Sequence, residues 1–365
     1  MDHQGSSTGE SDSSSRVHWA RTRRLTPVPA EYGESGVRYD RFTHKGVEVG
    51  RAPLKSADLH AGTEFVKATT AMMVGGVDAT ALSSTPVTLL DGGTQISRGS
   101  GFLFAHPNPG GGFVISLVTN YHVVTGAAPR RRRKPVGDSI GFELRIGGAS
   151  AVKVTSARLP LRTMDGKPTW IQCPTFPDAD VVVVPLPLDQ AMFETAPYCL
   201  DQATVDFDTV AYVGQQVGIV GYPLGISDRT NKLPIWKTGH IASEPGLDFD
   251  SDPKFLVDVT GRLGMSGSPV LAGHMHPYYT SSGMMRFGSS GRLLGVYTSN
   301  LVRQDSTEAN REELSVEELI GDRLPESHYR PELGVVWKAR LISETLTNLN
   351  IERHRSEIWS KLPEG

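Results

Sequence analysis

The sequence predicts a mainly β protein built from many short strands. Runs of β-branched and aromatic residues are short, and Gly, Pro or Asn separates most of them from the next run. The 365 residues include 39 glycines and 24 prolines, a content that favours short elements joined by turns over long helices. The hydrophobic share of 38% is too high for a disordered chain. Together these features indicate a β-sandwich or a β-barrel.

The expected strands fall into two groups along the chain. Residues 1–15 are polar and rich in Ser and Gly, which predicts a disordered leader, and the segment up to about residue 59 has no clear periodicity. The first group of expected strands comprises residues 101–104, 113–119, 142–146, 152–159 and 181–186. After a stretch rich in turn residues, the second group comprises residues 217–220, 235–241, 255–259, 269–271 and 293–298.

Two segments have the pattern of helices. Residues 308–320 are acidic with interspersed apolar positions. Residues 338–351 place Leu341, Ile342, Leu346 and Leu349 close to helical spacing. We expect the second segment to be an amphipathic helix that docks on the last strand of a mainly β domain.

Composition and charge exclude several classes of protein. A net charge of −3 argues against a strongly basic nucleic-acid-binding surface. The two cysteines, Cys173 and Cys199, are too few for a disulfide framework or a Cys-rich zinc site, and we expect both to be free buried thiols. The sequence has no apolar run near the roughly 20 residues of a membrane helix and no signal peptide, so the expected location is the cytoplasm.

Three short motifs carry the chemistry. Residues 118–124 read Val-Thr-Asn-Tyr-His-Val-Val, residues 178–184 read Asp-Ala-Asp-Val-Val-Val-Val, and residues 261–270 read Gly-Arg-Leu-Gly-Met-Ser-Gly-Ser-Pro-Val. A serine hydroxyl needs a base to take its proton, and a histidine suits because its ordinary pKa lies near 6.5. A buried carboxylate fixes the imidazole tautomer, and converging N–H groups stabilise the oxyanion that forms on the attacked carbonyl. The joint occurrence of the motifs therefore indicates nucleophilic catalysis by a serine.

At these motifs the sequence resembles the trypsin/chymotrypsin-like serine peptidases, and within them the bacterial Deg-type protease domain. The resemblance covers about residues 64–349. It includes Gly-Ser-Gly-Phe at 99–102, Gly-Ile-Val-Gly-Tyr-Pro at 218–223, Thr-Gly-His-Ile at 238–241, Gly-Val-Tyr-Thr at 295–298 and Leu-Gly-Val-Val at 333–336. It implies a fold of two six-stranded antiparallel β-barrels with a C-terminal α-helix and the site in the cleft between the barrels.

The resemblance also implies a role for each motif residue. His122 matches the base of the family, Asp180 the orienting acid and Ser266 the nucleophile, while the N–H groups of Gly264 and Ser266 form the oxyanion hole. This mechanism needs no cofactor and no metal. The domain boundaries that follow are an N-terminal extension at 1–58, a peptidase domain at 59–349 and a C-terminal tail at 350–365. The first barrel then spans about 59–195 and the second about 205–349.

Other interpretations of these residues are weaker. Asp178 competes for the acid role, but choosing it would leave Asp180 unpaired inside a buried strand. The α/β-hydrolase elbow requires Gly-x-Ser-x-Gly, whereas residue 268 is a serine followed by Pro269. Motifs of the β-lactamase type occur in the wrong order. His274 and His276 have no evident third metal ligand, so we expect a surface loop there.

Departures from the family pattern bear on activation and specificity. The residue before the nucleophile is Met265, which has no charge to pair with a newly cut N-terminus, so we expect no maturation by N-terminal insertion. In the family the position of Thr260 often lies at the base of the primary specificity pocket. Without an acid there we expect small or medium apolar side chains to be preferred, although the nearby Asp258 could change this.

The strand that precedes residue 300 is expected to line the same pocket. Tyr297, Thr298 and Ser299 would contact the substrate, which would pair its backbone with this strand. Thr298 or Ser299 would also donate a hydrogen bond to Asp180.

Two charged segments remain without an assigned role. The acidic segment 303–331 borders the substrate cleft in the family. It is either a solvated insertion or an acidic lid or docking element for a regulatory partner that shapes specificity. The basic run 130–134 lies between two prolines and predicts a solvated loop, with an attachment site for an anionic partner or an exposed cleavage site as the alternatives.

The sequence thus predicts a serine endopeptidase whose partner is a protein or peptide substrate, with no membrane or nucleic acid involved. The alternatives are a catalytically silent protease-like binding module and an esterase that uses the same triad. Deg-type proteins usually carry PDZ domains, but the segment after the closing helix is too short for one, so trimerisation and PDZ-based capture do not carry over.

Overall fold

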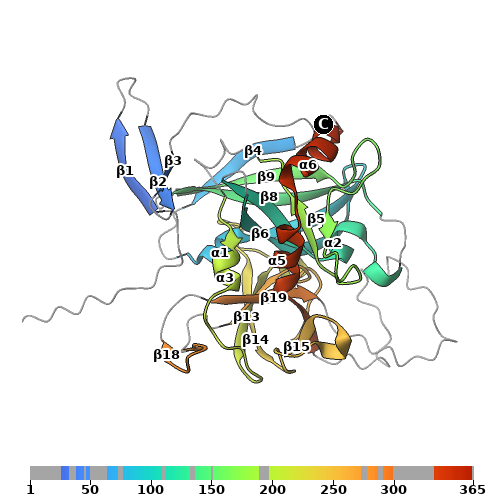
Figure 1. Cartoon of the computed structure of the whole chain (residues 1–365). Coiled ribbons are helices and arrows are strands. Elements are labelled where there is room, and N and C mark those ends of the chain that lie inside the picture. The colour runs from blue at the N-terminus through green and yellow to red at the C-terminus, as the bar shows by residue number, and fades with distance from the viewer. Residues whose placement is uncertain are drawn as a thin grey trace, which may run out of the picture.

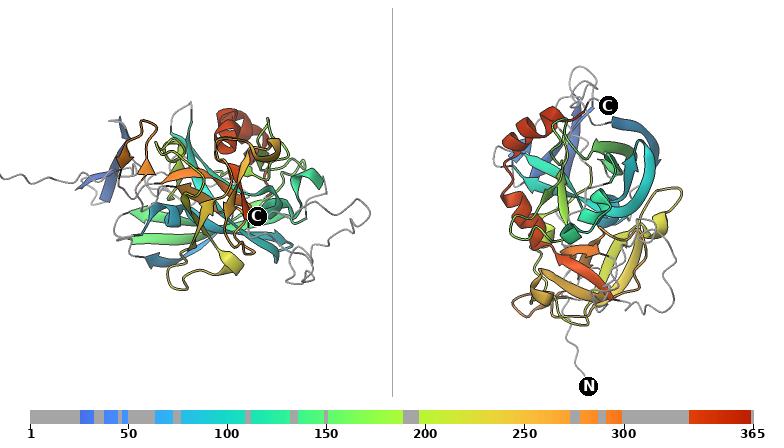
Figure 2. Two further views of the ribbon diagram at one scale, coloured as in Figure 1. Left: turned by 90° about the horizontal axis from the view of Figure 1, so that it is seen from below. Right: turned by 90° about the vertical axis from the view of Figure 1, so that its right-hand side faces the viewer.

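The fold consists of two β units with helices along one side (Figures 1 and 2). The structure is a computed structural model, and it describes residues 26–32, 38–44, 47–49, 64–72, 77–108, 112–131, 136–148, 151–188, 197–272, 278–286, 291–298 and 333–363. In Figure 1 the first unit lies above the second, and the C-terminal helices α5 and α6 extend from the second unit to the first.

The first unit is a β-sheet whose described part has nine strands. In order along the chain they are β4 (Glu64–Met72), β5 (Ser84–Asp91), β6 (Thr94–Pro107), β7 (Phe113–Thr119), β8 (Ser139–Gly148), β9 (Ala151–Pro160), β10 (Ile171–Gln172), β11 (Val182–Pro185) and β12 (Leu200–Asp201). Their spatial order is β10-β11-β7-β6-β5-β8-β9-β4, and β12 pairs in parallel with β6.

The second unit is a closed barrel, which the described residues build from six antiparallel strands. These are β13 (Gln216–Gly221), β14 (Ile235–Ile241), β15 (Lys254–Asp258), β16 (Pro269–Ala272), β19 (Arg292–Thr298) and β20 (Leu333–Lys338). They close in the order β13-β14-β15-β20-β19-β16. Alternate inward residues such as Ile219, Val257 and Val270 fill the interior, as the period of two in a strand requires.

The two units share a core because the middle strands of the first unit are buried on both faces. On β11, Val182 and Val184 point into the core of the first unit, whereas Val183 belongs to a second cluster. That cluster also contains Leu293 and Trp337 of the barrel. The unbroken valine run in the sequence therefore marks a strand that is covered by one unit on each side.

The mainly β fold class is confirmed, with one difference in detail. The second unit is the predicted six-stranded barrel, and β7 and β14 begin and end at the predicted residues. In the first unit, however, the described strands form one nine-stranded sheet in place of the expected ring of six, because short strands such as β10 and β12 extend it at positions with no periodic signal.

The remaining elements are short. They are β1 (Thr26–Tyr32), β2 (Arg38–His44), β3 (Val47–Val49), β17 (Tyr278–Tyr279), β18 (Met285–Arg286), α1 (Ala79–Ser83), α2 (Tyr121–Thr125), α3 (Gln202–Val205) and the 3-10 helices η1 (Pro129–Arg131), η3 (Pro223–Gly225), η4 (Phe249–Ser251) and η6 (Trp359–Lys361). Strands β1 to β3 form a separate three-stranded sheet where the sequence showed no periodicity.

The C-terminal segment contains two helices where the sequence predicted one. Helix α5 (Arg340–Thr347) packs Leu341, Ile342 and Leu346 into the core between the units. The first helix then ends, and α6 (Ile351–Glu357) follows its N-cap Asn350, whose Oδ1 accepts a hydrogen bond from Arg353 N at 2.9 Å.

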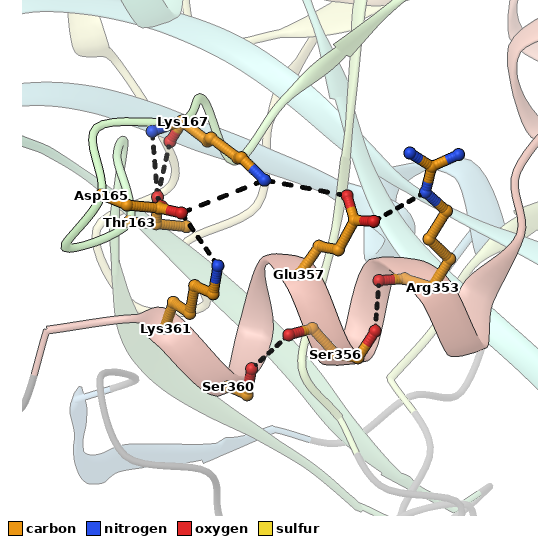
Figure 3. A network of polar contacts seen from close by, with 8 residues as sticks. All are labelled: Thr163, Asp165, Lys167, Arg353, Ser356, Glu357, Ser360 and Lys361. Carbon is orange, nitrogen blue, oxygen red and sulfur yellow. Dashed lines mark hydrogen bonds and ion pairs between the residues drawn. The ribbon is translucent and has the colours of Figure 1, made fainter.

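The segment 350–365, predicted as a tail, is instead part of the folded first unit as far as the structure describes it. Ile351, Trp359 and Leu362 are buried in the core of that unit. On the surface, Lys361 pairs with Asp165 at 2.9 Å, as Figure 3 shows. Exposed pairs of this kind contribute little, so the apolar contacts hold the segment in place.

Several predicted features lie outside the described residues. These are the leader 1–15, the helix at 308–320 with the rest of the acidic segment 303–331, the histidines His274 and His276, Ser299, and residues 132–134 of the basic run. Among the described helices, none combines the length and the apolar character that crossing a membrane would require.

Candidate active site

His122 lies on a short helix directly after a strand. Strand β7 ends at Thr119, and Asn120 begins α2 with its buried side chain donating a hydrogen bond to the backbone oxygen of Asp180 at 2.6 Å. Gly126, with a left-handed φ of 71°, ends the helix after little more than one turn. His122 is thereby fixed between β7 and the segment that enters β11.

The structure pairs His122 with Asp180. The distance from His122 Nδ1 to Asp180 Oδ2 is 2.6 Å, and the backbone N–H of His122 donates to Asp180 Oδ1 at 3.0 Å. Thr298 Oγ1 donates to Asp180 Oδ2 at 3.1 Å, which confirms the predicted contact between this strand and the acid. Asp178 is exposed and its ion pair is with Arg130 at 4.0 Å, so the alternative assignment of the acid to Asp178 is wrong.

Both side chains of this pair have shifted pKa values. Burial by itself lowers the pKa of His122, but the charge of Asp180 and the hydrogen bond to it outweigh burial and leave that pKa raised. Burial by itself raises the pKa of Asp180. The charge of His122, the hydrogen bonds from His122 and the hydrogen bond from Thr298 outweigh burial, so that the pKa of Asp180 is lowered. Asp180 is therefore ionised and favours the protonated imidazole, the form that a general base reaches after it has taken a proton.

Ser266 lies in a buried turn that is bonded to both units. Its backbone oxygen accepts a hydrogen bond from Ser100 N of β6 at 2.7 Å, while Gly267 N donates to Tyr297 O of β19 at 2.8 Å. Gly267 has a φ of +92°, and a Cβ at this position would lie 1.9 Å from Ser100 O. Only glycine permits this approach, which brings the serine turn of the barrel against the first unit.

The same contacts connect the Ser266 turn to the His122–Asp180 pair. Ser100 O accepts a hydrogen bond from the side chain of Thr119, which ends β7 just before α2. On its other side, Gly267 binds Tyr297, the neighbour of the Thr298 that donates to Asp180. The structure thus brings the three predicted catalytic segments together at the junction of the units.

The peptide bonds around Gly264 are held from both sides. Leu263 O accepts a hydrogen bond from Leu224 N at 2.6 Å, and because a trans peptide is planar, the N–H of Gly264 points to the opposite side. Gly264 O in turn accepts from Ser100 Oγ at 2.6 Å. Gly264 has a φ of +89°, and a Cβ there would lie 2.5 Å from Tyr222 O, so this predicted oxyanion residue is also restricted to glycine.

The described substrate-binding residues that the sequence predicts lie on β19 and in the segment between β15 and this turn. Thr260 follows β15, and its backbone oxygen accepts a hydrogen bond from the side chain of Lys237. Tyr297 and Thr298 are on β19, next to the serine turn. Ser299 lies outside the described residues.

Sequence reasoning missed two residues at this site. Ser100 belongs to the Gly-Ser-Gly-Phe motif of the resemblance, which predicted no role for its hydroxyl. In the structure this hydroxyl accepts a hydrogen bond from Tyr222 N at 2.9 Å and donates one to Gly264 O. Lys237 faces the barrel interior, and the alternation of strand 235–241 is the signal that could have indicated this.

The described residues contain no cluster that would suggest a metal centre, meaning three or more His, Cys, Asp or Glu side chains placed to share an ion. Cys173 and Cys199 are free, as predicted, with Cys173 buried and Cys199 partly buried. Burial, followed by the charge of Asp201, raises the pKa of the Cys199 thiol, which makes it a poor nucleophile.

The barrel fold, the His122–Asp180 pair and the glycine-flanked serine turn agree with the resemblance to the trypsin-like serine peptidases that the motifs indicated. A comparison with family models agrees: residues 99–275 match the trypsin-like peptidase domain. The match covers a little less than half of the chain.

A comparison with solved structures also found matches. A serine endoprotease from Yersinia pestis is 13% identical with a TM-score of 0.36, and the match covers 76% of this chain and 64% of that one. The thermostable serine protease AL20 from an extremophilic microorganism is 12% identical with a TM-score of 0.34, covering 61% of this chain and 88% of that one. The scabies mite inactivated protease paralogue S-I1 is 13% identical with a TM-score of 0.34, and the match covers 74% of this chain and 96% of that one.

The chain spans about two thirds of the Yersinia pestis protein, 64% of its length. A comparison with curated protein sequences found no match.

Proposed function

We propose that this protein is a serine endopeptidase that cleaves protein or peptide substrates through an acyl-enzyme on Ser266. The observation that carries the proposal is the 2.6 Å contact between His122 Nδ1 and Asp180 Oδ2. With Nδ1–H donated to the carboxylate, the other ring nitrogen, Nε2, is the one that can accept a proton. That is the tautomer that a base for a serine nucleophile requires.

The reaction would proceed in two steps. The Oγ of Ser266 forms a bond to the scissile carbonyl carbon while His122 Nε2 takes the hydroxyl proton. The C–N bond then breaks, and His122 gives the proton to the leaving amine. In the second step a water molecule, deprotonated by His122, attacks the acyl carbon, and the serine regains its proton as the ester bond breaks. Asp180 stays ionised throughout and stabilises the imidazolium.

The oxyanion hole would be formed by the N–H groups of Gly264 and Ser266. Support comes from the anchoring of Gly264, since the carbonyl before it is bound to Leu224 N and its own carbonyl to Ser100 Oγ. Donors that are fixed before the reaction cost no reorganisation when the charge forms, which is why such groups contribute strongly to catalysis.

Activation by a new N-terminus is not part of this proposal. Met265, at the position where an acid would pair with that terminus, is an apolar residue with 1% of its surface exposed in the barrel core. We therefore expect the full-length chain to react with a fluorophosphonate probe without prior cleavage. Labelling of a truncated form alone would contradict this expectation.

The direct test of the proposed function compares the wild type with the Ser266→Ala variant. Each protein is incubated with a cell lysate, and new protein N-termini are sequenced. We expect N-termini that only the wild type generates, and an identical set from both proteins would refute the endopeptidase. If the biological effect of the protein survives in the variant, the chain acts as a binding module, and turnover of nitrophenyl esters without any peptide cleavage would identify an esterase.

A further inference from the structure

Two polar side chains belong to the strand faces that carry the interior core of the barrel: Lys237 of β14, which is partly exposed, and Tyr297 of β19, which is buried. Strand β14 pairs with β13 so that Lys237 is directly opposite Ile219, a fully buried residue of the interior core. Directly opposed residues of an antiparallel pair share one face, so the Lys237 side chain enters the interior as well. Its ammonium donates to the backbone oxygen of Thr260, six residues before the nucleophile.

Tyr297 enters the same interior from β19. Its backbone N donates to Ser268 O and its backbone O accepts from Gly267 N, both at 2.8 Å, so the residue is fixed against the serine turn. The ring rests on Gly334, where a Cβ would lie 2.3 Å from Tyr297 Cε2. The side chain therefore occupies the space that the missing side chain of Gly334 provides.

The hydroxyl of Tyr297 is buried without a hydrogen-bond partner in the part of the chain that the structure describes, and only 1% of the residue is exposed. A buried hydroxyl without a partner destabilises a fold, so its retention requires an explanation. Burial raises its pKa to about 12, which keeps the group protonated and able to donate. A hydrogen-bond acceptor from a bound ligand would satisfy it.

We propose that Lys237 and Tyr297 select substrates with an acidic residue, glutamate or aspartate, immediately before the scissile bond. The inference rests on the proposed peptidase function, under which Thr260 and Tyr297 line the site for that side chain. A lysine ammonium has three N–H donors, and a carboxylate accepts from several donors at once. An ammonium and a phenol hydroxyl on strands of the same barrel therefore match a short carboxylate side chain.

The proposal replaces the expectation of an apolar specificity that the sequence suggested. The charge that could have favoured a basic substrate, Asp258, is exposed and pairs in register with the exposed His240 on the outer face of the barrel. The Lys237 ammonium is therefore on the inner face of the barrel wall and the Asp258 carboxylate on the outer, solvent-exposed face.

The first test measures kcat/KM for peptides that differ only in the residue before the cleaved bond, with Glu, Gln, Leu or Lys at that position. We expect the wild type to prefer Glu over Gln by about tenfold to a hundredfold, because a hydrogen bond to a charged group contributes on that scale. Lys237→Met is expected to abolish this preference. Lys254→Met is the matched control, because Lys254 is on the neighbouring strand, at the end of β15 away from Thr260, and pairs with Asp252.

The second test uses Tyr297→Phe. Removal of an unpartnered hydroxyl is expected to leave the melting temperature unchanged or to raise it, while the preference for Glu over Gln falls about threefold to thirtyfold. A purely structural tyrosine would change stability and all substrates alike. Any preference for Leu or Lys in the wild type, or a Glu preference that survives Lys237→Met, would overturn the proposal.

Two further measurements separate this proposal from the peptidase function itself. A fluorophosphonate probe reports whether Ser266 is reactive, whatever the substrate. Calorimetry with the Ser266→Ala variant measures binding of peptides that end in Glu, Gln or Leu, and we expect the Glu peptide to bind at least about tenfold more tightly. Labelling with equal binding of the three peptides would refute the specificity alone, whereas absence of labelling and of cleavage would refute both.

Discussion

Replacement of Ser100 by alanine is the sharpest test of how the oxyanion segment is held. Ser100 is fully buried, and its hydroxyl donates to Gly264 O at 2.6 Å and accepts from Tyr222 N at 2.9 Å. The alanine variant leaves both backbone groups buried without this partner. At about 1–3 kcal/mol for each of these two groups, we expect the free energy of unfolding to fall by roughly 2–6 kcal/mol.

The effect on activity follows from the position of Gly264. Loss of an oxyanion donor reduces kcat by roughly a hundredfold to a thousandfold. In the Ser100→Ala variant the donor is still present but less firmly held, so we expect kcat to fall by about tenfold to a hundredfold with little change in KM. The rate of fluorophosphonate labelling, which also generates an oxyanion, should fall with it.

The assay requires a control for stability. Ser116→Ala removes another fully buried hydroxyl of the first unit, one for which the described structure contains no hydrogen-bond partner. This variant should change the free energy of unfolding by about 0.5 kcal/mol or less and leave kcat unchanged. Both variants are measured below their melting temperatures and normalised to the folded fraction. A folded Ser100→Ala protein with wild-type kcat would refute the reasoning.

Three more predictions follow from the structure. Asp180→Asn should lower kcat by roughly ten thousandfold. Because Asp180 raises the pKa of His122, the variant should also move the acid limb of the residual kcat/KM profile to lower pH. An unmoved limb would show that the pair does not set the pKa of His122. Gly267→Ala should destabilise the protein by more than about 3 kcal/mol in thermal melts. The control is Gly166→Ala, which is also at positive φ but has open space around it, so it should show only the smaller effect of backbone strain. Equal effects of the two substitutions would contradict the close approach of Gly267 to β6. Burial lowers the pKa of His354 to about 4, so the folded state loses about 3 kcal/mol of stability as the pH falls from 7 to 4. The His354→Leu variant should lose less stability over that range, as measured by urea unfolding. Equal losses in the two proteins would contradict the assignment of this pH dependence to His354.

The strands of this fold could be predicted from the sequence better than the points at which its helices begin and end. The valine run at 181–184 predicts a buried strand, and the structure explains the lack of alternation by packing on both faces. The break between α5 and α6 was missed because the apolar spacing is nearly helical across it, and the cap at Asn350 decides the outcome.

The candidate site could be predicted where a motif carries its chemistry in adjacent residues. The need for glycine at Gly264 and Gly267 follows from such a motif, whereas the pairing of His122 with Asp180, 58 residues apart, followed from the resemblance of both motifs to the peptidase family. The roles of Ser100 and Lys237 depend on contacts between residues far apart in the chain, which only the packing of the two units and the register of the barrel strands bring together.

The central claim is that His122 activates Ser266 as a nucleophile, and the most direct measurement is the mass of the full-length protein after reaction with a fluorophosphonate. Peptide mapping locates the adduct, and the His122→Ala variant is treated in parallel. We expect one adduct per chain on Ser266 in the wild type and a labelling rate reduced by about a thousandfold or more in the variant. No adduct on the folded wild type, an adduct on another residue, or equal labelling of the two proteins would contradict the claim.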